Sequence, residues 1–113
     1  MTFDELSKNK PTLEWKQRMD EDEDLFTNEN INATNEILDS YIHSLKELRG
    51  NSTKDEVVEC VKKVVISLNE LNEHYDYFIE TMEREELYMF ITEAARIAGF
   101  ESDDDITEEW REW

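Results

Sequence analysis

The chain has 113 residues, of which 38% are hydrophobic and 37% charged, and its formal net charge at pH 7 is −18. This length suits a single helical domain over residues 1–113 with a core of its own, and the hydrophobic share is too high for a disordered acidic tail. Two glycines and one proline are too few for the frequent turns of a sandwich or barrel, so the composition predicts an all-α fold.

The sequence gives no sign of disulfides, export or membrane insertion. Cys60 is the only cysteine, which excludes an intramolecular disulfide framework and a cysteine-based zinc site. No charged-then-apolar leader opens the chain, and no apolar run approaches the roughly 18 residues of a membrane span. We therefore expect a cytoplasmic location and no contact with membranes.

Residues 1–30 are expected to be peripheral and partly irregular. Thr2 and Glu5 have the spacing of a capping box, and Pro11 disfavours helical backbone at Lys10, so two short helical segments are predicted on either side of this pair. Five apolar residues in this region are expected to cover one end of the core: Phe3, Leu6, Leu13, Trp15 and Met19.

Asp20–Asp24 is a run of five acidic residues whose alternate carboxylates match the first, third and fifth positions of an EF-hand calcium loop. Position six would be Leu25, where the loop needs a glycine, and position twelve would be Ile31, where it needs a glutamate. An EF-hand is therefore rejected, and a solvated linker is predicted.

Three longer helices are predicted, over about 31–49, 53–75 and 82–98. The connector between the first two is so short that they should form an antiparallel hairpin, against which the third helix packs to complete a small bundle. The helix over 53–75 begins at Thr53 with a capping box to Glu56, and its broad apolar stripe predicts a central position. Gly99 and Phe100 fit a Schellman turn at the end of the third helix.

No motif predicts a metal site or an active site. His43 and His74 each follow a carboxylate by four residues, whereas ferritin-like sites use Glu-x-x-His. The chain has no Gly-rich phosphate loop, no nucleophile elbow and no zinc-helix motif. We therefore expect no cofactor and no enzymatic activity.

The negative charge is concentrated near the C-terminus, because residues 76–113 carry a net charge of −10 and residues 51–75 only −2. Such a field repels nucleic acid and anionic membranes and attracts basic proteins. Thr107 is placed to cap a short last helix that carries Trp110 and Trp113 on one side. These tryptophans either close the bundle or form an aromatic anchor ringed by acids, as in a binding hot spot. The predicted partner-binding residues are Asp103, Asp104, Asp105, Glu108, Glu109, Trp110 and Trp113.

Several segments of the C-terminal part carry a family resemblance. They are Phe78-Ile79-Glu80-Thr81, Glu83-Arg84-Glu85, Ala94-Ala95 with Gly99, and Asp105-Ile106-Thr107 with Trp110-Arg111. Through them the span Leu68–Trp113 resembles the C-terminal half of a family of small uncharacterised bacterial acidic proteins, some of which look like immunity proteins beside bacterial toxins. The resemblance implies a bacterial, cytosolic and non-catalytic protein and assigns no functional residue.

These observations favour a non-catalytic acidic module that binds a basic protein, such as an immunity or inhibitor protein acting on a nuclease-type toxin. Two alternatives stay open. A DNA mimic would present long rows of carboxylates to a nucleic-acid-binding protein, and a self-associating structural protein would need an exposed apolar face. The sequence does not predict the oligomeric state.

Overall fold

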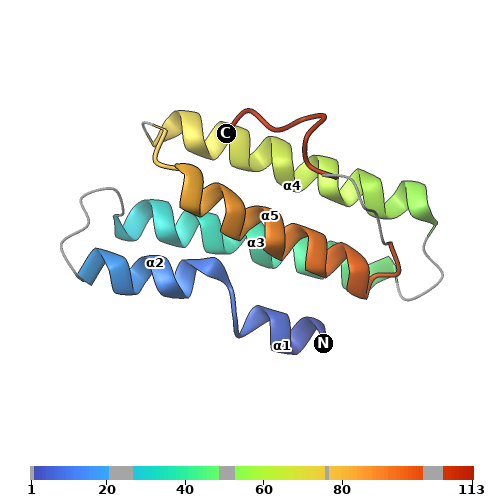
Figure 1. Cartoon of the computed structure of the whole chain (residues 1–113). Coiled ribbons are helices and arrows are strands. Elements are labelled where there is room, and N and C mark those ends of the chain that lie inside the picture. The colour runs from blue at the N-terminus through green and yellow to red at the C-terminus, as the bar shows by residue number, and fades with distance from the viewer. Residues whose placement is uncertain (1, 21–26, 49–52, 76, 101–105) are drawn as a thin grey trace.

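The computed structural model describes residues 2–20, 27–48, 53–75, 77–100 and 106–113, and every regular element within these ranges is a helix. The helices are α1 (Phe3–Ser7), α2 (Pro11–Asp20), α3 (Asn28–Leu48), α4 (Lys54–His74) and α5 (Thr81–Ile97). From α2 to α5, consecutive helices run in opposite directions, and α1 continues the line of α2 along α3 and α5 (Figure 1). The predicted all-α bundle with its antiparallel hairpin is confirmed.

The boundaries of α4 and α5 follow from local hydrogen bonds. Thr53 Oγ1 accepts from the Glu56 N–H at 3.2 Å, and the Thr53 N–H donates to Glu56 Oε1 at 3.3 Å, which is the predicted capping box. After α5, the Phe100 N–H donates to the Ala95 carbonyl and the Gly99 N–H to the Arg96 carbonyl, both at 2.9 Å. With Gly99 at φ +102°, this is the predicted Schellman turn.

The start of α3 differs from the prediction, because the helix begins at Asn28 instead of about Ile31. Thr27 Oγ1 accepts from the Asn30 N–H at 3.1 Å, and Asn30 Oδ1 accepts from the Thr27 N–H at 2.9 Å. Asn30 thus takes the role that glutamate or glutamine has in a capping box. This reciprocal pair satisfies the first backbone donors and lets the helix start one turn early.

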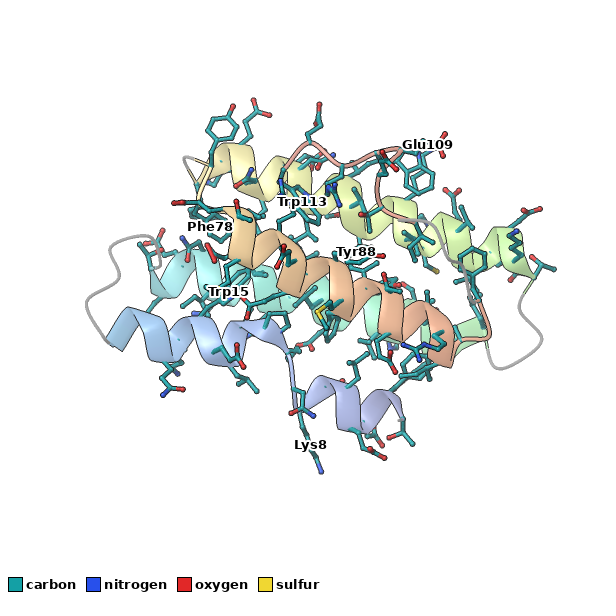
Figure 2. All side chains as sticks on the ribbon, in the orientation of Figure 1. Lys8, Trp15, Phe78, Tyr88, Glu109 and Trp113 are labelled. Carbon is teal, nitrogen blue, oxygen red and sulfur yellow. The ribbon has the colours of Figure 1, made fainter. Side chains whose placement is uncertain are left out.

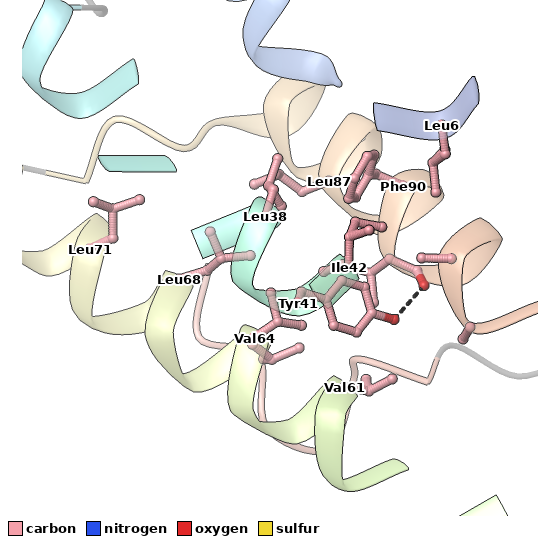
Figure 3. Close-up of a cluster of buried hydrophobic side chains, with 14 of the residues drawn as sticks. Leu6, Leu38, Tyr41, Ile42, Val61, Val64, Leu68, Leu71, Leu87 and Phe90 are labelled. Carbon is pink, nitrogen blue, oxygen red and sulfur yellow. Dashed lines mark hydrogen bonds between the residues drawn. The ribbon is translucent and has the colours of Figure 1, made fainter. Parts of the chain in front are cut away.

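The centre of the bundle is α3, and the expectation that the helix over 53–75 is central is wrong. α3 and α5 each pack against all four other helices, and the contacts of α3 are the more extensive, whereas α4 packs, among the described helices, only against α3 and α5. Ile66 on α4 is 38% exposed, so the apolar stripe of α4 is wider than the surface that this helix buries. The side chains of α3 meet those of α4 and α5 in one cluster (Figure 3), where the buried Tyr41 hydroxyl donates to the Ile91 carbonyl at 2.8 Å.

The N-terminal helices contribute to this core. Trp15 is fully buried, stands edge-on to Phe78 with ring centroids 5.9 Å apart, and donates from Nε1 to Glu86 Oε1 at 3.2 Å (Figure 2). Leu6 is buried as predicted, but Leu13 is 51% exposed, so its assignment to the core is wrong. Residues two apart on a helix point about 200° apart, and Leu13 therefore faces away when Trp15 faces inward. The side chain of Met19 lies outside the described residues.

The turn between α4 and α5 is built on Asn72. The Tyr77 N–H donates to the Asn72 carbonyl at 2.7 Å, and the Ile79 N–H donates to Asn72 Oδ1 at 2.9 Å. Tyr77 has φ 60°, which reverses the chain and directs the buried Phe78 into the core. The turn therefore brings both Phe78 and Ile79 into the core at this end of the bundle.

Candidate functional site

The C-terminal segment, residues 106–113, forms turns in place of the predicted last helix. The Trp110 and Arg111 N–H groups both donate to the Thr107 carbonyl, at 3.3 and 3.0 Å, and residues 111–113 form no regular element. Thr107 is fully buried, and its hydroxyl accepts from Arg111 Nη1 at 3.1 Å. Thr107 therefore anchors the segment, but as the start of a turn and not as a helix cap.

Asn69 on α4 fastens this segment to the bundle. Its Nδ2 donates to the Trp110 carbonyl at 2.7 Å, and its Oδ1 accepts from the Glu112 N–H at 2.9 Å. One amide side chain thus bonds a carbonyl and an N–H two residues apart in the segment. The segment consequently lies along α4 with a defined backbone path (Figure 1).

The two tryptophans of the segment are half-buried and pack against the core, together with Ile106. The Arg111 guanidinium lies 5.5 Å from the centre of the Trp113 ring, within the range of a cation–π contact. Trp113 Nε1 is buried and has no hydrogen-bond partner in the described part of the chain. The packing of Trp110 and Trp113 against the core matches the interpretation in which the tryptophans close the bundle, the first of the two given by the sequence.

The acidic residues of the segment face solvent. Glu108, Glu109 and Glu112 are exposed, and Figure 2 places Glu109 at the outer edge of the molecule with Trp113 closer to the helices. Asp103, Asp104 and Asp105 lie outside the described residues, as does most of the Asp20–Asp24 run. Of the predicted partner-binding residues, the structure therefore brings together two exposed glutamates and two half-buried tryptophans.

Cys60 lies in a groove of about 360 Å³ between α3 and α4, which three serines and Lys63 also line. Partial burial raises the pKa of the Cys60 thiol, and the neighbouring Lys63 charge opposes this only in part. A thiol with a raised pKa is a weak nucleophile, because the thiolate is the reactive form. The groove therefore offers no support for cysteine-based catalysis.

The two histidines are exposed on α3 and α4. His43 Nε2 lies 3.0 Å from Glu47 Oε1, one turn further along α3 and not at the Asp39 carboxylate of the sequence pattern. Within the described residues, no three histidine, cysteine, aspartate or glutamate side chains come together as a metal site would require.

A second groove, which the sequence reasoning missed, lies between α1, α2 and α5 and measures about 390 Å³. Apolar side chains and three glutamates line it, and Met89 of α5 lies at its edge with 68% of its surface exposed. Its residues come from three separate stretches of sequence. The one local signal is that methionines and glutamates alternate along α5 at steps of three and four residues, which places them on one face of the helix.

Comparison of the chain with protein families, curated proteins and solved structures finds no match in any of the three. Among the described residues, no helix has the length and apolar character needed to cross a bilayer.

Proposed function

We propose that the chain is a non-catalytic acidic module that acts in the cytoplasm by binding a basic protein. The observation that carries this proposal is the C-terminal segment, where Glu108, Glu109 and Glu112 are exposed on a backbone that Asn69 holds in place. The segment belongs to residues 76–113, whose net charge is −10. Because the span Leu68–Trp113 resembles a family that includes immunity-like proteins, the specific role that we favour is an immunity or inhibitor protein acting on a nuclease-type toxin.

The physical reasoning starts from charge. Complementary charge between two proteins raises the association rate by orders of magnitude, and salt screens the effect. A binding segment that is already held in its bound shape also loses less conformational entropy when the partner arrives. The tryptophans serve this arrangement by fixing the segment, and only their exposed edges are free to contact a partner.

The surface of α4 supports protein binding over DNA mimicry. A mimic needs a long, regular row of carboxylates, whereas Lys62 and Lys63 separate Glu59 from Glu70 along this helix. Self-association is also disfavoured, because each copy carries a net charge of −18 and two copies repel each other.

The test begins with affinity purification of the tagged chain from its native cell and identification of the partner. We expect a basic protein whose association rate falls steeply when NaCl is raised from about 0.05 to about 0.5 M. A partner without excess positive charge, or an association rate insensitive to salt, would contradict the proposal.

Two charge-reversal variants locate the contact. Glu108→Lys with Glu109→Lys changes the segment, and Glu36→Lys with Glu47→Lys makes the same change in charge at exposed positions of α3. We expect the first variant to lower the association rate by at least about tenfold and the second to lower it much less. Equal losses in both variants would mean that net charge acts without a defined site.

A further inference from the structure

The groove between α1, α2 and α5 has an apolar floor. Three apolar residues line it: Leu6 of α1, Pro11 at the start of α2 and Phe90 of α5. Leu6 and Phe90 belong to the buried core. Met89 adds a thioether side chain that is 68% exposed. A groove of this kind gives apolar side chains of another molecule a surface that they can cover without disturbing the bundle.

The edge of the groove is acidic. Glu14 of α2 and Glu86 and Glu93 of α5 all line it, and its described lining contains no cationic side chain. Arg96 neutralises part of this charge through its contact with Glu93, and Glu86 accepts a hydrogen bond from the Trp15 indole N–H. The whole chain carries a net charge of −18, so a basic segment is attracted to this surface.

α5 continues this pattern beyond the groove. Met82, Glu86, Met89 and Glu93 follow one another at intervals of four, three and four residues, which places them on one face of the helix. Met82 is 58% exposed. Methionine side chains adapt to apolar surfaces of different shapes, and interleaved glutamates would pair with lysine or arginine at matching helical spacing.

From this geometry we propose that the groove between α1, α2 and α5 binds a cationic amphipathic helix of the partner, with apolar residues on the exposed Met89 and Met82 side chains and lysines or arginines near the glutamates. This rests on the proposed function, since it names the chemistry of the segment by which a basic partner would dock. A second copy of the chain fits less well, because its net charge of −18 would meet a groove of the same sign.

The first experiment titrates the full isotope-labelled chain with a synthetic helical peptide of leucine and lysine arranged with an apolar face. We expect the methyl signals of Met82 and Met89 to shift and saturate. A peptide of the same composition in scrambled order keeps the charge and loses the apolar face, and should bind at least about tenfold more weakly. Equal binding of the two peptides, or shifts spread over all helices, would overturn the proposal.

A matched pair of variants separates docking from general attraction. Met89→Glu removes the apolar contact and adds a negative charge, whereas Ile66→Glu makes a similar change at an exposed position of α4. If the peptide docks in the groove, Met89→Glu should lower the affinity for the peptide by about tenfold, and Ile66→Glu should leave it unchanged. If charge alone attracts the peptide, both variants should bind it as tightly as the unchanged chain or more tightly. That result would refute the groove as the binding site.

The same variants keep this inference distinct from the proposed function. If the native basic partner binds Met89→Glu as well as the unchanged chain but loses affinity for the Glu108→Lys and Glu109→Lys variant, the groove is wrong and the proposed function stands. If no basic partner is found, the proposed function fails and the peptide titration still decides the groove. A dimer that Met89→Glu dissociates in sedimentation would assign the groove to a second copy and overturn the cationic occupant.

Discussion

Replacing Asn69 with alanine should release the C-terminal segment while the bundle stays folded. The side chain makes two hydrogen bonds to the segment, one to the Trp110 carbonyl at 2.7 Å and one from the Glu112 N–H at 2.9 Å. Each such bond contributes about 1 kcal/mol net, so the variant should lose about 2 kcal/mol of docking free energy. This corresponds to an increase of about thirtyfold in the ratio of released to docked segment.

Hydrogen exchange is the suitable assay, because local opening exposes only the amides of the element that opens. The Glu112 amide should exchange about thirtyfold faster in Asn69→Ala, while the amides of α3 keep their rates. Asn69→Asp retains an acceptor for the Glu112 N–H but places a carboxylate oxygen beside the Trp110 carbonyl, so it should open the segment at least as far. Glu70→Ala, at the exposed neighbouring position, is the control.

Unchanged exchange at Glu112 in both variants would refute the reasoning, because it would mean that the packed tryptophans alone hold the segment. A uniform rise over the whole chain would also refute it, since it would show that the segment and the bundle unfold together.

Four further outcomes are expected. The melting temperature should rise by a few degrees with moderate NaCl, because salt screens the self-repulsion of a chain with net charge −18, and a fall would mean that ion pairs dominate. Leu38→Ala, at a fully buried position of α3, should cost about 2–5 kcal/mol in urea unfolding, and a loss below about 1 kcal/mol would contradict the central place of α3. Gly99→Ala should cost about 1 kcal/mol in thermal unfolding through its φ of +102° alone, since the space beside Gly99 is open, and Gly99→Asn should cost less. Burial, and to a smaller extent Cys60, raises the pKa of Tyr41, so the unfolded chain ionises first and stability should fall as the pH rises above about 10, less steeply in Tyr41→Phe.

The parts of the fold that the sequence predicts are those specified by neighbouring residues. The Thr53–Glu56 capping box and the Gly99–Phe100 turn each need only a few adjacent positions, and both occur as predicted. The start of α3 was missed because Asn30, usually a residue of turns, acts as the capping partner of Thr27.

The arrangement of the helices depends on information that no short pattern holds. α3 buries polar residues such as Thr34, whose hydroxyl donates to the Asn30 carbonyl at 2.7 Å, so its buried face is wider than its apolar stripe. α4 has the broader stripe and yet leaves Ile66 38% exposed. An apolar stripe shows that a helix is buried on one face, but it does not show how many neighbours cover the helix.

The candidate site also combines features that follow from single residues with features that depend on contacts between distant parts of the sequence. The exposure of Glu108 and Glu109 is consistent with their charge. No short pattern reveals the role of Asn69, because it lies more than 40 positions before the backbone it holds, with separations of 41 and 43 residues. The groove between α1, α2 and α5 likewise exists only after three distant stretches have packed together.

The burial of Trp15 has a consequence for the order of folding. Its hydrogen bond to Glu86 closes a separation of 71 residues, whereas α3 and α4 meet across a short connector. Closing a longer loop costs more chain entropy and is slower, so the α3–α4 hairpin should form early and the docking of α2 should complete the fold. Trp15 would then report the last step, and substitutions around it should mainly speed unfolding while leaving the rate of hairpin formation unchanged.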